Sequence, residues 1–174
     1  MPRNIEIKAY VDDLASVRAK AKELSKSDGQ EIIQRDTFFN SSQGRLKLRY
    51  YLAGRDAELI FYNRPDQEGP KLSDYHIVKT NAPDDLSKVL EGAIGIRGEV
   101  RKTRWLYMVG QTRVHCDSVE NLGDFAELEV CLEDDQTLED GQKIAEDLMT
   151  KLGIDKSKLI SGAYMDLLNK KSKE

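Results

Sequence analysis

The chain has 174 residues, of which 39% are hydrophobic and 33% are charged, and this length is typical of one domain with a sizeable core. Its 27 basic and 31 acidic residues give a formal net charge of −4, which argues against general nucleic-acid binding, because such proteins present a basic surface. An anionic partner would have to be recognised locally, so we expect a small, enclosed ligand and neither nucleic acid nor membrane.

Residue usage also argues against zinc-binding and membrane-spanning classes. The cysteines, Cys116 and Cys131, and the histidines, His76 and His115, lack the spacing of zinc ligands. No signal-like segment precedes the first predicted strand, and no apolar run approaches the length of a membrane span. We therefore expect a cytoplasmic protein with reduced thiols.

The first half of the chain predicts strands interrupted by one helix. Alternating apolar residues mark the strands, and apolar residues at helical spacing mark the helix, which Asp12 or Asp13 caps. Two prolines and a lack of periodicity mark a loop. The predicted elements are a strand over 3–11, a helix over 14–24, a strand over 32–39, two strands around a tight turn at 53–56, a loop over 65–72 and a strand over 73–78.

The second half predicts a long hairpin between helices. Pro83 suits the first turn of a helix, Thr137 with Asp140 resembles a capping box, and Gly153 ends the helix that this box begins. We expect a single domain over 1–170 and a frayed tail over 171–174. The predicted elements are a helix over 83–90, a hairpin over 96–117 that turns at 109–110, a strand over 125–132, a helix ending at Gly153 and a short helix over 161–168.

Six of the strand-like segments carry ionisable residues at every second position, with apolar residues between them. Successive side chains of a strand point to opposite faces, so each segment places its charges on one face. A solvated outer face is the alternative, but such faces usually mix Thr, Ser, Gln and Lys. The six segments are 4–8, 45–49, 58–64, 102–104, 113–117 and 127–130.

These patterns predict an α+β fold in which about eight antiparallel strands close into a β-barrel tunnel. The helices carry apolar stripes that must be buried against the apolar face of the sheet, which places the helices outside the barrel. The charged face then lines the interior. An ordinary small barrel instead fills its interior with apolar side chains. Acids concentrate on the first and last strands and bases on those between, so we expect an acidic wall facing a basic one.

The acids of this face are suited to a hard divalent cation. Glu6, Asp117, Glu127 and Glu129 supply the carboxylate oxygens that Mg²⁺ and Mn²⁺ prefer, and without a metal they would raise each other's pKa values. Alternatively, each acid pairs with an opposing base. His115 faces the same way, and we expect it to be a polar wall residue more than a general base.

The bases of this face are suited to a triphosphate. Arginine binds phosphate oxygens with a planar fork and lysine acts as a point charge. No glycine-rich phosphate loop is present, so side chains must do the binding. The predicted substrate-binding residues are Lys8, Arg45, Lys47, Arg49, Arg64, Lys102, Arg104 and Arg113.

The order of these segments resembles the CYTH family, the triphosphate tunnel metalloenzymes. The segment Asn4–Lys8 resembles the family's amino-terminal Glu-x-Glu-x-Lys signature, with Asn4 in place of its first glutamate. The resemblance covers essentially the whole chain. The later matching segments are 45–49, 59–64, 100–104 and 113–117, followed by Gly123, Phe125, Glu127 and Glu129 and by a closing segment at 164–168.

The resemblance implies an eight-stranded tunnel, a triphosphate-containing substrate and one or two divalent cations. Our first hypothesis is hydrolysis of a triphosphate. Inorganic tripolyphosphate is the leading substrate, because it needs only charge recognition, and another small organic triphosphate such as thiamine triphosphate is the alternative. A first Mg²⁺ or Mn²⁺ would bind Glu127 and Glu129, with Asp117 as a possible third ligand, and a second would lie nearer Glu6. The residues expected to act in catalysis are Glu6, Lys8, Arg49, Lys102 and Arg104.

Two other functions stay open at this stage. One is conversion of ATP to cyclic AMP and pyrophosphate, as in class IV adenylate cyclases, which needs a base pocket. Tyr75, Trp105 and Tyr107 are candidates for an aromatic platform, although packing within the sheet is the favoured explanation for them. The other is a binder without catalysis, because Asn4 removes one metal-binding charge while offering only a neutral carbonyl oxygen.

Overall fold

A computed structural model describes residues 3–63 and 67–172. Within these ranges the chain forms eight strands and four α-helices, together with a 3₁₀ turn at Lys156–Lys158. The strands are β1 (Arg3–Tyr10), β2 (Gln30–Phe39), β3 (Arg45–Tyr51), β4 (Ala57–Asn63), β5 (Lys71–Thr80), β6 (Ile96–Val109), β7 (Thr112–Val119) and β8 (Gly123–Cys131), and the helices are α1 (Leu14–Ser25), α2 (Pro83–Ile94), α3 (Leu138–Leu152) and α4 (Tyr164–Ser172).

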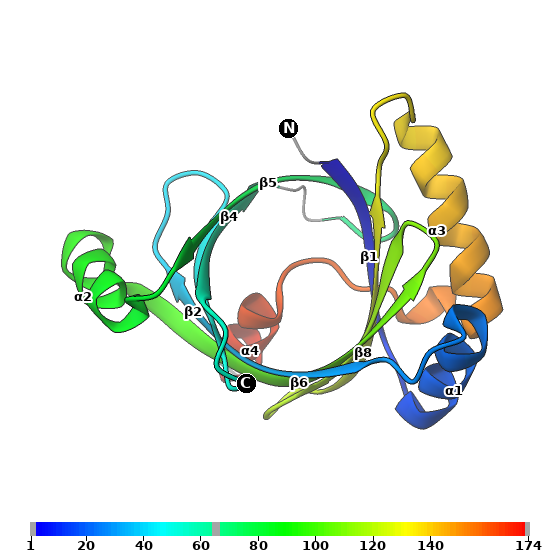
Figure 1. The fold of residues 1–174 in the computed structure, drawn as a ribbon, viewed down its shortest axis with the longest axis horizontal. Helices are drawn as coiled ribbons and strands as arrows, with labels where there is room; N and C mark the ends of the chain where they lie inside the picture. Colours follow the sequence, from blue (N-terminus) through cyan, green and yellow to red (C-terminus); the bar gives the residue numbers. More distant parts are fainter. Residues whose placement is uncertain (1–2, 64–66, 173–174) are drawn as a thin grey trace.

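The eight strands close into one antiparallel barrel (Figure 1). Their order around it is β1-β5-β4-β3-β2-β6-β7-β8, so the first and last strands of the chain are neighbours. A closed barrel leaves no sheet edge unpaired. The predicted fold, a barrel with helices outside it, is confirmed.

Side-chain alternation gives the barrel wall two unlike faces. In β1, Ile5 and Ile7 belong to the outer apolar core, whereas Asn4, Glu6 and Lys8 line the interior. The same alternation recurs around the ring, so the largest apolar cluster lies outside the tunnel, and a smaller one fills the end of the barrel that α4 closes. Full burial of each large aliphatic side chain contributes about 1.5–3 kcal/mol.

Helices α1 and α3 cover the outer face around β1, β7 and β8 (Figure 1). Helix α3 begins at Thr137, whose capping box with Asp140 is present, and ends at Gly153, which adopts a left-handed φ of 71°. It buries Leu148 and Leu152 against the core of the barrel wall. These contacts confirm the predicted start, end and apolar stripe of the helix.

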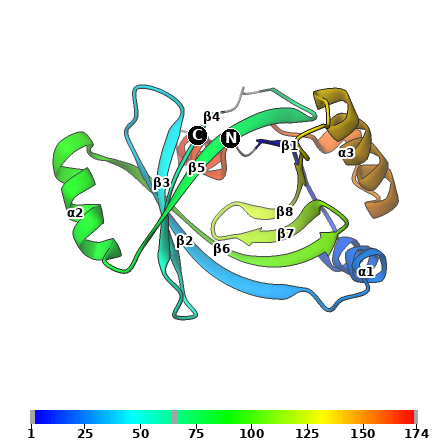
Figure 2. The ribbon, with the colours of Figure 1, turned by 45° about the horizontal axis from the view of Figure 1, so that its top comes forward.

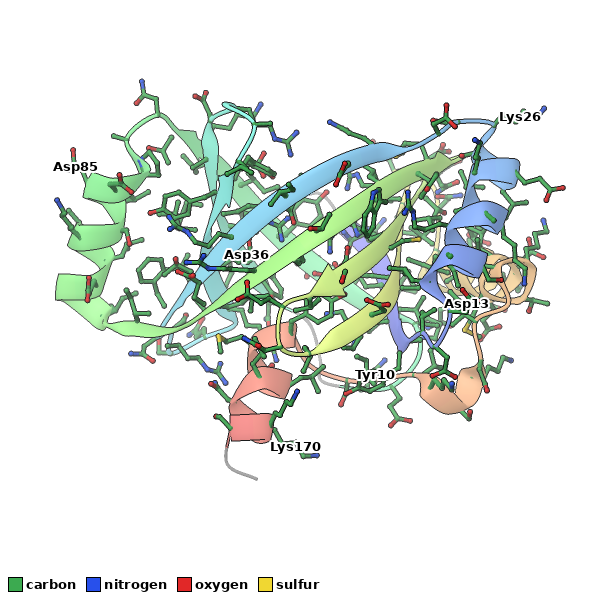
Figure 3. The ribbon with its side chains drawn as sticks, turned by 90° about the horizontal axis from the view of Figure 1, so that it is seen from below. Tyr10, Asp13, Lys26, Asp36, Asp85 and Lys170 are labelled. Atoms are coloured by element: carbon green, nitrogen blue, oxygen red, sulfur yellow. The ribbon has the colours of Figure 1, made fainter. Side chains whose placement is uncertain are left out.

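Helix α2 lies on the opposite side of the barrel (Figure 2). Pro83 occupies its first turn, and Leu86 and Leu90 pack against Phe39 and Leu48 on the outer face of β2 and β3. Between α2 and α1, the middle of β2 and β6 has no helix in front of it (Figure 3), whereas α1 covers the part of β6 that carries Trp105 and Tyr107.

Helix α4 closes one end of the barrel, where Lys170 marks it in Figure 3. Tyr164 and Met165 are buried against the inward side chains Val100 and Phe125. The connection from α3 runs along β1, where the backbone N–H of Ile160 donates to the carbonyl of Lys8 at 2.9 Å. The tunnel is therefore capped at this end.

Several predicted boundaries differ from the structure by a few residues, and two of the differences fall on the expected tail and the expected loop. Helix α4 continues to Ser172, so the first two residues of the expected tail are helical, and Lys171 is held there because its Nζ donates to the carbonyl of Asn121 at 2.8 Å; residues 173–174 lie outside the described ranges. Strand β5 begins at Lys71, inside the predicted loop. None of the helices formed by residues 3–63 and 67–172 is long and apolar enough to cross a membrane.

Candidate active site

The barrel encloses a cavity of about 350 Å³. Side chains from all eight strands line it, and Ala163 and Tyr164 contribute from the end that α4 closes. Six of the eight predicted substrate-binding residues line this cavity: Lys8, Lys47, Arg49, Lys102, Arg104 and Arg113.

Of the other two predicted substrate-binding residues, only Arg45 is among the described residues, and it does not line the cavity. Arg45 lies near the end that α4 closes, where its Nη2 donates to Oδ2 of Asp166 at 2.7 Å. It has the same strand parity as Lys47, but this ion pair with α4 holds it away from the tunnel. Arg64 falls outside the described residues.

Arg49 is held in place by a buried aspartate directly opposite it. Asp36 on β2 faces Arg49 on β3 in the strand register, and Nε and Nη2 of Arg49 donate to its two carboxylate oxygens at 2.7 and 2.8 Å. Nζ of Lys47 and Lys102 lie 3.4 and 3.8 Å from Oδ2 of Asp36. Burial would raise the pKa of Asp36, but these three cations outweigh burial and hold it well below its usual value. Asp36 therefore gathers bases from two strands at one point.

Arg104 is held in the same way by a second buried aspartate. It faces Asp117 across β6 and β7, and its Nε and Nη2 donate to the two carboxylate oxygens of Asp117, each at 2.7 Å. The hydroxyl of Tyr164 also donates to Oδ2 of Asp117 at 2.7 Å. Two neighbouring hairpins thus present one fixed guanidinium each to the tunnel, which suits bidentate recognition of phosphate.

The basic side chains of the cavity outnumber the acidic side chains that pair with them, and the pKa values of two lysines are lowered. Burial, and next the charge of Arg49, lower the pKa of Lys47 to about 8. Burial, and next Arg104 and Arg49, lower the pKa of Lys102 well below its usual value. A bound polyanion would relieve this repulsion, so the electrostatics of the cavity favour an anionic ligand.

An acidic wall stands where the first and last strands meet. Across β1 and β8, Glu6 faces Glu129, and Lys8 faces Glu127. Burial raises the pKa of Glu129, and so does the nearby charge of Glu6. The predicted acidic wall is present and includes Glu6, Glu127 and Glu129, all of which line the cavity.

Opposing bases occupy part of this wall, as the alternative interpretation predicted. Nη1 of Arg113 and Nδ2 of Asn4 donate to Oε1 of Glu129 at 3.0 and 2.6 Å. Oε2 of Glu127 lies 3.7 Å from Nζ of Lys8 and 3.7 Å from Nη2 of Arg104. The charge of Arg113 opposes the rise in the pKa of Glu129 that burial and Glu6 cause.

The acidic wall offers the oxygen ligands that a divalent cation prefers, but the side chains that carry them do not surround a single point. Oδ1 of Asn4 is buried and makes no hydrogen bond, and it lies beside the crowded carboxylates of Glu6 and Glu129, so hard oxygen donors converge there. In the described part of the chain, however, no three His, Cys, Asp or Glu side chains stand close enough together to hold one ion. Metal binding would therefore require side chains now paired with bases to turn toward the ion.

Asp117 does not line the cavity, although the sequence predicts it as one of the metal-binding acids there. It shares strand parity with Arg113 and His115, but its side chain is fully buried and does not line the cavity. Its oxygens accept hydrogen bonds from Arg104 and Tyr164. The structure thus gives this carboxylate a supporting position beneath Arg104.

His115 lines the cavity as predicted. Its Nε2 lies 3.9 Å from Oε2 of Glu129. Burial, and next the charge of Arg104, lower the pKa of His115 well below its usual value, so the imidazole is neutral near pH 7. Nδ1 makes no hydrogen bond.

The three candidate platform aromatics divide between the two faces. Tyr75 lines the cavity. Trp105 and Tyr107 pack on the outer face beneath α1, where the guanidinium of Arg18 lies 4.1 Å from the Trp105 ring and its Nε donates to the Tyr107 hydroxyl at 3.3 Å. The packing explanation is correct for these two residues.

Sequence reasoning missed two residues that organise the site. Asp36 is the only charged residue among the inward positions of β2, so the alternation of charges did not reveal it. The sequence feature that could have indicated it is a single acid on a strand predicted to lie among basic strands. Tyr164 was noted only as part of a closing segment. Its hydroxyl partner lies 47 residues away, and no local pattern predicts such a contact.

Comparisons with known proteins agree with this arrangement. The model of the CYTH domain family matches residues 2–164. A curated relative, the adenylate cyclase CyaB of Aeromonas hydrophila, is 31% identical over 102 residues, which is 58% of this chain and 53% of that protein. The match thus spans about half the length of that relative.

Solved structures share the fold at low sequence identity. The PH1012 protein of Pyrococcus horikoshii superposes with a TM-score of 0.82 at 22% identity, over 94% of this chain and 98% of its own. HpAC1 of Hippeastrum, described as having a dominant triphosphatase activity, superposes with a TM-score of 0.68 at 16% identity, over 98% of this chain and 96% of its own. At these identities the likeness shows the fold alone.

Proposed function

This chain belongs to the CYTH domain family, and on that premise we propose that it hydrolyses a triphosphate with the help of a divalent cation, inorganic tripolyphosphate being the substrate. The observation that carries the proposal is the enclosed cluster of Lys47, Arg49, Lys102 and Arg104. Burial, and next the charges of the neighbouring arginines, lower the pKa values of both lysines, and a small, highly charged anion would relieve the repulsion between these charges. Tripolyphosphate needs only such charge recognition.

The basic residues would bind and orient the substrate. Arg49 and Arg104 are fixed by their aspartates and offer planar forks to phosphate oxygens. Lys8, Lys47 and Lys102 add point charges from three other positions around the ring. Fixed charges of this kind favour a transition state in which negative charge spreads over the transferred phosphoryl group.

The acidic wall would hold Mg²⁺ or Mn²⁺. Glu6, Glu127 and Glu129 are the candidate ligands, with the carbonyl oxygen of Asn4 as a neutral fourth. When bound, such a cation neutralises phosphate charge and lowers the pKa of a coordinated water. Arg113 would move from Glu129 to the incoming phosphate as that carboxylate turns to the metal.

The test is a panel of substrates measured with Mg²⁺ and with Mn²⁺. Phosphate release from tripolyphosphate, ATP and thiamine triphosphate would be followed together with cyclic AMP formation from ATP. We expect tripolyphosphate to be hydrolysed fastest and turnover to cease when EDTA removes the metal. Tight binding of all three with no turnover would overturn the proposal in favour of a binder.

One observation favours the cyclase as a second candidate. The curated relative at 31% identity is named an adenylate cyclase, and the cavity is also lined by Tyr51, whose ring lies 3.6 Å from the guanidinium of Arg55. A flat cation–aromatic pair of this kind can stack on a base. Formation of cyclic AMP and pyrophosphate from ATP, faster than phosphate release, would establish this alternative.

A further inference from the structure

His115 is a buried side chain of the tunnel whose ring nitrogens make no hydrogen bond within the described part of the chain. It lines the cavity from β7 and is 4% exposed. Its Nδ1 is buried without a partner, and its Nε2 lies 3.9 Å from Oε2 of Glu129, which is too far for a hydrogen bond. A buried polar group without a partner costs free energy that an apolar side chain would not. The presence of an imidazole here therefore indicates a ligand.

The gap between Nε2 of His115 and Oε2 of Glu129 fits one divalent cation. Nitrogen and oxygen ligands lie about 2.1 Å from such an ion, so two of them stand at most about 4.2 Å apart when they share it. The observed 3.9 Å is inside this limit. Nη1 of Arg113 and Nδ2 of Asn4 donate to the other oxygen of Glu129, Oε1, so Oε2 is the oxygen that faces the imidazole.

Asn4 brings a second orphaned polar atom to the same carboxylate. Its Oδ1 is buried without a hydrogen bond, while Nδ2 of the same amide donates to Oε1 of Glu129 at 2.6 Å. An amide oxygen is a neutral ligand for a hard cation. Side chains with an orphaned atom thus flank Glu129 from both neighbouring strands, β1 and β7. The remaining coordination positions fall to water and to phosphate oxygens of the substrate.

An imidazole nitrogen distinguishes between divalent cations in a way that carboxylates do not. Mg²⁺ takes oxygen ligands and keeps several of its waters. Imidazole suits first-row transition ions, whose affinity for a given site rises from Mn²⁺ to Co²⁺. The buried imidazole of His115 is neutral near pH 7, so one of its nitrogens offers a lone pair to such an ion.

We propose that Nε2 of His115 binds the divalent cation together with Oε2 of Glu129, and that this nitrogen ligand makes the acidic wall select a first-row transition ion over Mg²⁺. The inference rests on the proposed function, because it concerns the same cation. It adds to that function a ligand of a different chemical kind and a preference among metals.

The test compares substitutions at the two histidines of the chain. His115→Gln replaces the nitrogen ligand by an amide, and His115→Phe keeps a flat ring but removes both nitrogens. His76→Gln is the matched control, because His76 is exposed on β5 and does not line the cavity. Thermal unfolding of each variant establishes that it is folded.

The direct readout is the pulsed EPR spectrum of Mn²⁺ bound without substrate, in which an imidazole ligand adds a nitrogen modulation. We expect this modulation in the wild type and in His76→Gln, and its loss in both His115 variants. The wild-type spectrum tests the nitrogen ligand even if a variant fails to fold.

Calorimetry without substrate measures the preference among metals. The wild type should bind Co²⁺ more tightly than Mn²⁺, and Mn²⁺ more tightly than Mg²⁺. Loss of even a supporting partner of a metal ligand lowers affinity about 10–100-fold, so we expect His115→Phe to weaken Co²⁺ and Mn²⁺ binding at least roughly tenfold. The loss should be largest for Co²⁺ and smallest for Mg²⁺, and His76→Gln should match the wild type.

The possible failures are distinguishable. A wild type that binds neither a divalent cation nor tripolyphosphate refutes the proposed function itself. A wild type that binds Mn²⁺ without the nitrogen modulation, or a modulation that persists in His115→Phe, refutes only the role of His115. Equal losses of Co²⁺ and Mg²⁺ affinity in the His115 variants also overturn it, because a general change of the wall would then explain the effect. Weaker binding of metal-free tripolyphosphate with unchanged metal affinities would instead make His115 a phosphate donor.

Discussion

At the scale of single residues, Glu129 is the cavity acid that most directly bears on a metal. It is partly buried, it faces Glu6 across the strand pair, and Asn4 and Arg113 donate to the same oxygen. A cation at this wall would replace the two donors with a stronger charge. The role of Glu129 as a ligand is therefore the most direct test of the metal hypothesis.

We expect Glu129→Gln to abolish metal-dependent turnover while the fold is kept, because the amide preserves shape and removes a negative ligand. Phosphate release would be measured across a titration of Mn²⁺. Glu58→Gln is the matched control, since Glu58 also lines the cavity but accepts from the Tyr51 hydroxyl on the opposite side of the barrel. Near-normal turnover and metal dependence in Glu129→Gln would mean that the wall is only a network of ion pairs.

Substitution of Asn4 tests the same acidic wall by adding a carboxylate instead of removing one. We expect Asn4→Glu to lower the Mn²⁺ concentration needed for half-maximal activity, because it adds a charged ligand to the neutral one present. Without metal, the same change should lower the melting temperature, since it places a carboxylate beside Glu129 where Nδ2 now donates at 2.6 Å. Asn4→Gln is the control for side-chain length. If neither the half-maximal concentration nor the melting temperature changed, Asn4 would not face the metal.

At the scale of elements, two hairpins perform the same task. β2–β3 and β6–β7 each place an arginine opposite a buried aspartate, and β2 and β6 are neighbours. The four side chains thus form two adjacent forks on one side of the ring. Breaking one fork should weaken substrate binding without disturbing the acidic wall.

We expect Arg49→Ala to weaken the binding of a non-hydrolysable triphosphate by roughly 1.5–3 kcal/mol, the range for hydrogen bonds to charged groups, and Arg104→Ala to have a similar effect. Calorimetric titration of each variant measures this. Arg101→Ala is the control, since Arg101 lies on the same strand as Arg104 but is exposed and pairs with Glu99, so its loss should have little effect. Unchanged affinity in both tunnel variants would mean that neither arginine contacts the triphosphate.

The elements also show how far a sequence can carry such a prediction. Alternation of charge located the inward face of β1, β3, β6, β7 and β8 because strand parity is a local property. It failed for Arg45 and Asp117, which have the right parity but are withdrawn from the tunnel by Asp166 and Tyr164. Both partners belong to α4, and how that helix docks on the barrel depends on contacts between residues far apart in the chain.

At the scale of the whole molecule, a chain of net charge −4 encloses a cavity in which cations repel one another. Closure of the barrel brings Lys47, Arg49, Lys102 and Arg104 together from strands that are far apart in sequence. Burial, and next the charges of the neighbouring arginines, lower the pKa values of Lys47 and Lys102, so an incoming anion favours the protonated form of both amines. Substrate binding and proton uptake should therefore be linked.

The last prediction concerns this linkage. The pKa of Lys47 is about 8, against an ordinary 10.5, because of burial and next the charge of Arg49. A bound triphosphate favours the protonated amine, so the affinity for tripolyphosphate should be near its maximum below pH 7 and should fall as the pH rises through 8, with uptake of a proton on binding. Calorimetry in buffers of different ionisation enthalpy measures that uptake directly.

Lys47→Arg separates the titration of Lys47 from that of the ligand itself. A guanidinium remains charged over this whole range, so the variant should lose the proton uptake near pH 8 while it keeps the affinity that the wild type shows at pH 7. Lys102, whose pKa is also lowered, titrates in both proteins, so its contribution cancels in the comparison. If the wild type and the variant took up the same number of protons at pH 8, Lys47 would already be charged in the empty tunnel, and the cavity would carry less repulsion than its geometry indicates.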